Sequence, residues 1–277
     1  MQTFDRRYMP LDPGERVLDL GCGEGRHVIA TSCLDGADSI GVDLSLADLA
    51  TARQRHAQFR ETLAGLSPRA SSQNAAPREG DALFALLAGD GLGLPFPDAC
   101  FDVVICSEVL EHVPDYEAAL VEIERVLKPG GRFCLSVPRA WCERICWFLS
   151  REYHQVRGGH LRIFDSARLR TQVEALQLEC YQSHGAHALH SVYWWLQCLL
   201  WKRRERSWLV RQYHRLLVWD MMSSPMLTRT LERLLNPYLG KSVVMYFRKP
   251  APAPTPAQPS RPGSASMETT TAESARA

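Results

Sequence analysis

An acidic residue and two closely spaced glycines follow one another where a predicted strand ends. The strand covers positions 17–20 and contains Asp19, and Gly21 and Gly23 come after it. Glycines at alternate positions leave backbone amides and carbonyls uncovered at a strand's carboxyl end, where small ligands bind in open α/β sheets. The fingerprint for nicotinamide cofactors needs a third glycine where this chain has Arg26, and it places a pyrophosphate over a helix N-terminus. The Asp19 carboxylate would repel a phosphate, so the pattern favours a cationic ligand that carries an amine.

Two more acidic residues end strand patterns further along the chain. Positions 40–43 form a short strand pattern that ends in Asp43, about two dozen residues after the first acid, where a carboxylate can accept both ribose hydroxyls. The alternative role for Asp43 is an acidic N-cap for the helix expected from Ser45. A third strand pattern at 86–91 contains Asp90 at its end.

The order of these motifs resembles that of class I S-adenosylmethionine-dependent methyltransferases of the type 11 kind. The resemblance covers residues 16–138 and includes a fourth strand at 101–106 and a Lys-Pro-Gly-Gly turn at 128–131 that leads into a fifth. It implies that S-adenosylmethionine is the cofactor, that the second acid binds its ribose and that the third accepts from the adenine amino group. It also places the segment after the fourth strand beneath the methionine moiety. The resemblance assigns to cofactor binding Asp19, Gly21, Gly23, Gly25, Asp43, Leu44, Asp90, Gly91 and Ser107.

Two histidines are candidates for the general base. Methyl transfer from a sulfonium is an in-line displacement that depends on alignment and water exclusion, but an oxygen or nitrogen acceptor can need its proton removed. His160 precedes the helix expected after the fifth strand, and similar family members keep a histidine there beside the substrate. His112 follows the fourth strand. The structural alternatives are a hydrogen-bonded role for His160 and packing against the strand end for His112. Glu111 could orient His112, but we expect it to be an exposed carboxylate.

Composition and charge narrow the class of protein. With 277 residues and 45% hydrophobic content, the chain can bury one large core or a core plus a small subdomain. A net charge of +1 does not indicate a nucleic-acid partner. Nine cysteines without a Cys-x-x-Cys pair argue against a disulfide framework and a zinc site, and we expect no metal. They predict buried or idle thiols in a reducing compartment.

The N-terminal residues contain no apolar segment of the kind a secretory signal needs. The longest apolar stretch, 192–201, is about half of what a bilayer crossing requires. The basic run at 202–206 is either a solvated turn between core helices or a contact with an anionic membrane surface. We therefore expect a cytoplasmic protein, with peripheral contact at the inner membrane face as the further hypothesis.

Alternating strand and helix patterns predict an α/β fold with a doubly wound parallel sheet. The resemblance implies seven strands in a mostly parallel, Rossmann-like methyltransferase fold, with an antiparallel last strand and a helical insertion before it. The later elements are expected as a helix at 166–177, a sixth strand at 178–182, the insertion at about 184–237 and the last strand at 242–247. We expect one methyltransferase domain over 1–249.

Three segments lie outside that minimal sheet. The insertion at 184–237 contains five of the seven tryptophans, a heavy apolar load for a segment packed on one side, and we expect it to recognise the acceptor. Residues 67–78 read as a polar surface loop to which we assign no function. The Pro, Ser, Thr and Ala-rich tail at 250–277 is predicted to be disordered.

Three functions are compatible with these patterns. The leading hypothesis is a methyltransferase that acts on a small-molecule or lipid-like acceptor. The second is a catalytically silent methyltransferase fold that serves as a binding subunit, although the acids and glycines of the motifs are intact. The third is a nicotinamide-dependent dehydrogenase, which Arg26 and the Lys-Pro-Gly-Gly motif oppose. The patterns fix neither oxygen, nitrogen nor carbon as the methylated atom, and they leave the oligomeric state open.

Overall fold

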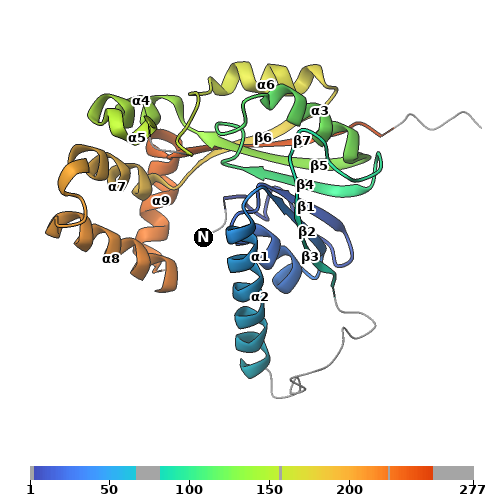
Figure 1. Ribbon diagram of the computed structural model, residues 1–277, viewed down its shortest axis with the longest axis horizontal. Coiled ribbons are helices and arrows are strands. Elements are labelled where there is room, and N and C mark those ends of the chain that lie inside the picture. The colour runs from blue at the N-terminus through green and yellow to red at the C-terminus, as the bar shows by residue number, and fades with distance from the viewer. Residues whose placement is uncertain (1–2, 67–81, 156–157, 224, 252–277) are drawn as a thin grey trace, which may run out of the picture.

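The computed structural model describes residues 3–66, 82–155, 158–223 and 225–251. The strands in these ranges form one mixed sheet and are β1 Arg16–Leu20, β2 Asp38–Asp43, β3 Phe84–Ala88, β4 Phe101–Ser107, β5 Leu127–Pro138, β6 Glu179–Ala186 and β7 Ser242–Arg248. Neighbouring strands follow the order β3-β2-β1-β4-β5-β7-β6. β1 to β5 pair in parallel, and β7 lies antiparallel between β5 and β6. The predicted fold class is confirmed (Figure 1).

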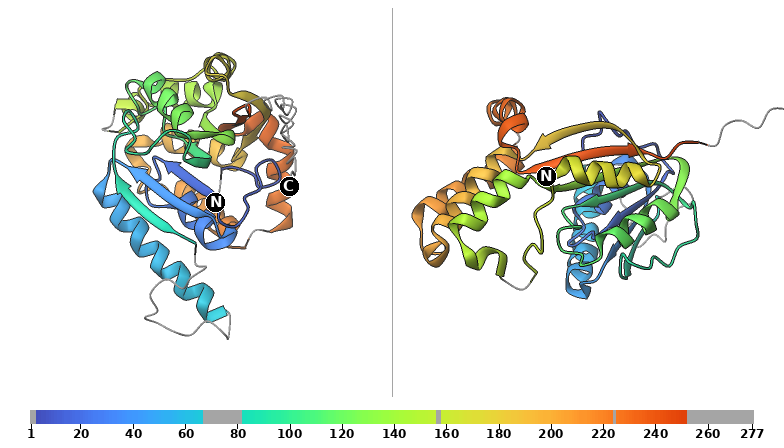
Figure 2. Two further views of the ribbon diagram at one scale, coloured as in Figure 1. Left: turned by 90° about the vertical axis from the view of Figure 1, so that its right-hand side faces the viewer. Right: turned by 90° about the horizontal axis from the view of Figure 1, so that it is seen from above.

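The helices divide into those that cover the sheet and those of the insertion. Their bounds are α1 Arg26–Asp35, α2 Leu46–Leu66, α3 Tyr116–Val126, α4 Ala140–Leu149, α5 Arg151–Gln155, α6 Ser166–Ala175, α7 Ala188–Leu199, the 3-10 helix η1 Trp201–Arg203, α8 Trp208–Ser223 and α9 Met226–Leu239. α1 and α2 pack on β1 to β3, whereas α3 contacts β5 and α6 contacts β6. Figures 1 and 2 show α7, α8 and α9 gathered beside the sheet, next to α4.

The core lies along the central strands. Every residue of β4 except Asp102 is buried, as expected of a parallel strand covered on both faces. Val104 and Phe133 of the paired strands β4 and β5 belong to the largest apolar cluster, together with Leu120 and Ile123 from α3. This packing fixes the strand ends that carry the site.

Acidic N-caps start two of the helices that cover the sheet. The Asp115 carboxylate accepts from the Ala118 N–H at 3.1 Å, and the Asp165 carboxylate accepts from the Ala167 N–H at 2.9 Å. Each cap satisfies a backbone donor that the first helical turn leaves without a partner. The starts of α3 and α6 therefore follow from the sequence.

β6 is longer than expected, which corrects the start of the insertion. The strand was expected to end at 182, but Ser183, His184 and Gly185 continue it and pair with β7. These residue types are typical of turns, so the pairing with the apolar β7 overrides their local preference. His184 belongs to the sheet, and the insertion begins only after Ala186.

A smaller correction concerns the fifth strand. The Lys-Pro-Gly-Gly segment at 128–131 lies inside β5, where the register against β4 shifts, rather than before the strand. The loop at 67–78 lies outside the described residues, as does the tail from 252 onward. Among the described helices, none combines the length and the apolar character needed to cross a bilayer.

Candidate active site

The residues assigned to the cofactor lie along one edge of the sheet. β3, β2, β1 and β4 are parallel neighbours, so their carboxyl ends meet on the same side. Asp43 is the last residue of β2, Ser107 is the last residue of β4, and Asp90 comes two residues after β3. The structure thus brings together the ends of four strands whose motifs are far apart in the sequence.

The glycine turn after β1 needs its glycines for two different reasons. Gly21, Gly23 and Gly25 all have positive φ, at 69°, 50° and 89°, a conformation that L side chains rarely adopt. A Cβ atom on Gly21 would collide with Val109, whereas one on Gly23 would meet nothing within 4 Å. Gly21 therefore allows close packing, and Gly23 leaves uncovered backbone that a ligand can approach.

Asp43 connects the end of β2 to this turn. Its Oδ2 accepts from the Gly23 N–H and its Oδ1 accepts from the Ser45 N–H, both at 2.8 Å. The N-cap of α2 is supplied by the Ser45 hydroxyl, which accepts from the Asp48 N–H at 3.2 Å. The carboxylate is thus held in place by backbone donors, and each oxygen keeps a lone pair that can accept from a ribose hydroxyl.

Asp19 lies behind the glycine turn. It is 2% exposed, and its Oδ2 accepts from the Val28 N–H of α1 at 2.9 Å. Burial raises the pKa of Asp19 to about 7, helped by the nearby Asp43 and opposed by the Val28 N–H and by Arg26. A neighbouring cation stabilises the ionised form of such a buried carboxyl group, so the site suits a ligand with a positively charged amine.

The remaining cofactor residues differ in what they expose. Leu44 is 73% exposed, and the exposed Asp90 uses Oδ1 to accept from the Leu92 N–H at 3.1 Å. An apolar side chain and a carboxylate on adjoining strand ends fit a flat base that carries an amino group. Ser107 is buried, and its Oγ lies 2.9 Å from the Ser136 Oγ of β5, so its hydroxyl bonds within the sheet.

A histidine and a buried carboxylate form a hydrogen-bonded pair beyond β5. The His160 Nδ1 lies 2.6 Å from the Glu143 Oε1, and Glu143 is 2% exposed on α4. Burial by itself would raise the pKa of Glu143, but the hydrogen bond from His160, with the positive charges nearby and the Trp147 indole N–H, outweighs it and lowers that pKa. An ionised carboxylate only accepts, so His160 Nδ1 is the donor, and in the neutral imidazole this tautomer leaves the lone pair on Nε2.

The loop after β4 buries Glu111, so the expectation of an exposed carboxylate is wrong. Glu111 is 1% exposed, and neither of its oxygens has a hydrogen-bond partner among the described residues. Burial, with the Glu108 carboxylate nearby, raises the pKa of Glu111 well above its usual value. The burial has a structural cause, because the chain returns over this loop and the Leu161 N–H donates to the Glu111 carbonyl at 2.9 Å.

His112 comes next in the same loop and lies against the second candidate base. Its ring centroid is 5.0 Å from that of His160, in an edge-to-face arrangement. Burial and the neighbouring His160 lower the pKa of His112, which favours its neutral form. Ligand atoms of Glu111, His112 and His160 lie within 4.8 Å of one another, so the fold gathers both predicted histidines at one place.

Glu143 is the site residue that the sequence analysis missed. Its partner follows seventeen residues later in a loop, so no local spacing links the two. A signal was present in the pattern of α4, where Glu143 shares the buried face with Cys142 and Cys146. An acidic residue on the apolar face of a helix needs a partner, because an unpaired buried carboxylate is costly.

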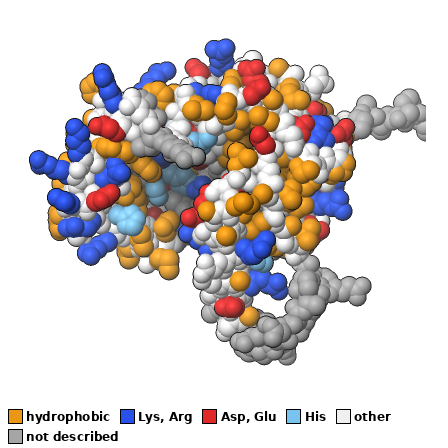
Figure 3. All heavy atoms as spheres, in the orientation of Figure 1, with side chains coloured by type: hydrophobic (Ala, Val, Ile, Leu, Met, Phe, Trp, Pro, Cys, Tyr) orange, Lys and Arg blue, Asp and Glu red, His pale blue; other side chains and the backbone are white. Residues whose placement is uncertain are grey.

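The insertion has an apolar surface bordered by basic residues. Large apolar side chains of α8 and α9 that are more than half exposed are Trp208, Leu209, Met222, Met226, Leu227, Leu234 and Tyr238. Residues 188–239 contain eight Lys and Arg against three Asp and Glu, a net charge of +5 in a chain whose net charge is +1. Figure 3 shows Lys and Arg side chains interspersed with apolar ones over this part of the molecule.

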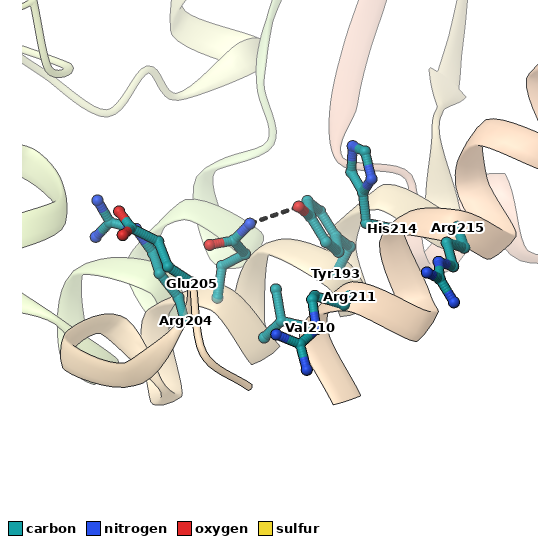
Figure 4. Close-up of a pocket in the computed structure, with 8 residues that line it drawn as sticks. Tyr193, Arg204, Glu205, Val210, Arg211, His214 and Arg215 are labelled. Carbon is teal, nitrogen blue, oxygen red and sulfur yellow. Dashed lines mark hydrogen bonds between the residues drawn. The ribbon is translucent and has the colours of Figure 1, made fainter. Parts of the chain in front are cut away.

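A cavity of about 380 Å³ lies between α7 and α8 on the insertion. Figure 4 shows Tyr193 near Arg211 and His214, with Arg204 and Glu205 on the other side of this cavity, and the Tyr193 hydroxyl accepts from the Gln197 amide. The Arg204 guanidinium lies 3.8 Å from the centre of the Trp201 ring, which fixes it by a cation–π contact. The cavity is therefore lined by three arginines, one carboxylate from Glu205 and the ring of Tyr193.

Comparison with curated proteins finds methyltransferases. A 27-O-demethylrifamycin SV methyltransferase of Amycolatopsis mediterranei is 32% identical over 128 residues, which cover 46% of this chain and 40% of that protein. A demethylmenaquinone methyltransferase of Parafrankia sp. is 39% identical over 130 residues, which cover 47% of this chain and 49% of that protein. The chain thus spans about half the length, or less, of these relatives.

Solved structures share the fold. The YcgJ protein from Bacillus subtilis matches with a TM-score of 0.54 at 19% identity, covering 88% of this chain and 95% of that one. Phosphoethanolamine N-methyltransferase 2 from Haemonchus contortus, in complex with S-adenosyl-L-methionine, matches with a TM-score of 0.52 at 18% identity, covering 88% and 51%. The profile of a family described as methyltransferase domain matches residues 2–183, well over half of the chain. The chain belongs to the class I S-adenosylmethionine-dependent methyltransferases.

Proposed function

We propose that this protein transfers a methyl group from S-adenosylmethionine to a hydroxyl or amine of a small, lipid-like acceptor by in-line displacement. The observation that carries the proposal is the His160–Glu143 pair, whose imidazole packs against His112 in the loop that follows β4. The relatives are named for methylation of a rifamycin and of demethylmenaquinone, which is consistent with a ring-bearing acceptor. The alternative remains a silent binding subunit, which needs no base.

The strand-end residues fit the cofactor. When bound, S-adenosylmethionine supplies an activated methyl group on a sulfonium. In this proposal Asp43 accepts from the ribose hydroxyls, Asp90 accepts from the adenine amino group and Leu44 packs on the base. The uncovered backbone at Gly23 receives the methionine moiety, and the Asp19 carboxylate stabilises its ammonium group through space.

His160 is the proposed base. Its Nε2 accepts the proton of the acceptor hydroxyl or amine, and Glu143 stabilises the imidazolium that results. Glu143 acts through His160, so it is a positioning residue. The ring of His112 packs on the edge of this pair and helps exclude water from it.

The insertion is the proposed acceptor-binding element. Its exposed apolar residues and its net positive charge suit an apolar molecule that lies in, or leaves from, an anionic lipid surface. In this proposal α8 and α9 contact the membrane surface peripherally. The acceptor then reaches the base without crossing water.

The test separates binding from turnover. Calorimetry measures S-adenosylmethionine binding, and an assay for S-adenosylhomocysteine follows turnover with a membrane-lipid extract and with an aqueous cell extract. The proposal requires product from the lipid extract and its loss in His160→Ala. Tight cofactor binding with no product from either extract would support the silent binding subunit, and product from the aqueous extract alone would remove the lipid-like acceptor.

A further inference from the structure

A second cluster of ligand-type side chains lies away from the proposed base. His187 follows β6, His190 lies in the first turn of α7, and Glu232 projects from α9. Ligand atoms of all three lie within 4.8 Å of one another. Figure 3 shows histidine side chains in the hollow between the insertion and the sheet.

The three residues are half-buried, but four of their polar atoms are shielded from solvent. Both ring nitrogens of His187, Nδ1 of His190 and Oε1 of Glu232 are buried and have no hydrogen-bond partner among the described residues. An unpartnered buried polar group costs about 1–3 kcal/mol, and more when it is charged. Four such atoms at one place call for a ligand that satisfies them together.

The surrounding contacts hold the cluster in shape. The Asn236 Oδ1, one turn after Glu232 on α9, accepts from the Ala188 N–H at 2.9 Å, and the Ser191 hydroxyl donates to the Leu239 carbonyl at 2.6 Å. These bonds fix the start of α7 against α9. His187 itself has φ 65° and ψ 45°, a left-handed conformation that is unfavourable for a side chain of its size.

Charged groups of both signs surround the cluster. Arg26 and Lys241 lie near His187 and would repel a dication. Asp220 lies near His190 and Glu232, and its carboxylate and that of Glu232 offset these two cations.

We propose that His187, His190 and Glu232 bind one divalent transition-metal ion, of which Zn²⁺ is the best match to two imidazoles and a carboxylate. Tetrahedral metal bonds of about 2.0–2.2 Å place donor atoms about 3.3–3.6 Å apart, so the three donors, which lie within 4.8 Å of one another, move closer together when the metal binds. The site opens on a cavity of about 340 Å³ that His187, Glu232, Thr3 and Arg6 help to line. A water or an oxygen atom of a small molecule in this cavity completes the coordination.

The absence of a Cys-x-x-Cys pair does not bear on this site, because its ligands are imidazoles and a carboxylate that come from the start of α7 and from α9. His187 and His190 are three residues apart, whereas Glu232 is more than forty residues further on. The packing of α9 on α7 and on β6 brings them together. The inference is independent of the methyl acceptor.

Titration of the full chain with Co²⁺ and Zn²⁺, after chelator treatment, tests the proposal. We expect one equivalent of Co²⁺ to give visible d–d absorption that Zn²⁺ removes, and Zn²⁺ to raise the melting temperature. His187→Ala, His190→Ala and Glu232→Gln should each weaken Co²⁺ binding more than about tenfold, since even indirect partners of a metal cost that much. Glu232→Gln keeps the shape of the side chain, so it remains informative if a histidine variant misfolds.

Two matched controls decide where a bound metal lies. His214→Ala removes an exposed histidine of the same insertion, and His112→Ala removes a ligand from the other cluster. Both should leave Co²⁺ binding unchanged. The proposal is overturned if the intact chain binds no Co²⁺, if binding is lost in His112→Ala but kept in Glu232→Gln, or if the spectrum shows thiolate charge-transfer bands.

Discussion

The substitution Glu143→Gln tests the proposed base through its partner. It removes one negative charge while keeping an oxygen that can accept from His160 Nδ1. Glu143 is 2% exposed and the bond to His160 is 2.6 Å long, so water screens the lost charge little. A hydrogen bond to a charged group contributes about 1.5–3 kcal/mol, which corresponds to a fall in kcat of about 10- to 150-fold.

The assay measures initial rates of S-adenosylhomocysteine formation and, separately, cofactor affinity by calorimetry. The kcat should fall while the Kd for S-adenosylmethionine stays unchanged, because the cofactor residues lie on β1 to β4 and Glu143 lies on α4. Circular dichroism and the melting temperature establish that the variant is folded.

A double-mutant cycle with His160→Ala makes the test specific. If Glu143 acts only through His160, Glu143→Gln should have no further effect on kcat in the His160→Ala background. An equal loss in both backgrounds, or an undiminished kcat in the single variant, would refute the pairing of carboxylate and base.

Three further predictions concern the cofactor, the loop after β4 and the insertion. Asp43→Ala should weaken S-adenosylmethionine binding by about 2–4 kcal/mol, since two hydrogen bonds to a charged acceptor are lost, and calorimetry on the folded variant measures this loss. Because the pKa of Glu111 is raised in the folded protein, the folded state is favoured while Glu111 is protonated, and this stability is lost as the pH rises from the pKa of the unfolded chain through that of the folded one. The melting temperature of the wild-type protein should therefore fall between pH 5 and 8, and Glu111→Gln should make this fall smaller. Differential scanning fluorimetry measures both. Substituting glutamine for the arginines of 203–206 should weaken sedimentation with anionic vesicles by up to about 100-fold, at about 1 kcal/mol for each charge, whereas the same change at exposed arginines of α6 should not. A wild-type protein that stays in the supernatant at low salt would contradict the membrane contact.

The sheet and the cofactor edge could be predicted because their signals are local. β1 and β4 are short apolar runs that end in glycine or serine, and Asp19 and Asp43 stand directly at strand ends. Because β1 pairs in parallel with β2 and β4, the carboxyl ends of these strands lie at the same edge of the sheet. The assignments to individual cofactor atoms remain predictions.

The base environment could not be predicted because its contacts are tertiary. Glu111 reads as a polar loop residue, and only the return of the chain at Leu161 buries it. The extension of β6 through His184 likewise depends on pairing with β7 rather than on local preference. Tertiary contacts decided each of these cases.

The insertion contacts the residues that surround the proposed base. The Trp195 indole N–H of α7 donates to the Cys142 carbonyl of α4 at 3.2 Å, one residue before Glu143. The Tyr153 ring packs against His160, with centroids 6.0 Å apart, and against Trp194, with centroids 5.7 Å apart. Removing the insertion would therefore free the α4 side chains that hold the base as well as remove acceptor contacts. A loss of turnover in such a variant therefore has two explanations, a lost acceptor site or a displaced base. The double-mutant cycle of Glu143→Gln and His160→Ala, repeated on the residual turnover of the shortened protein, separates them. The loss identifies acceptor recognition only if the coupling between Glu143 and His160 is preserved.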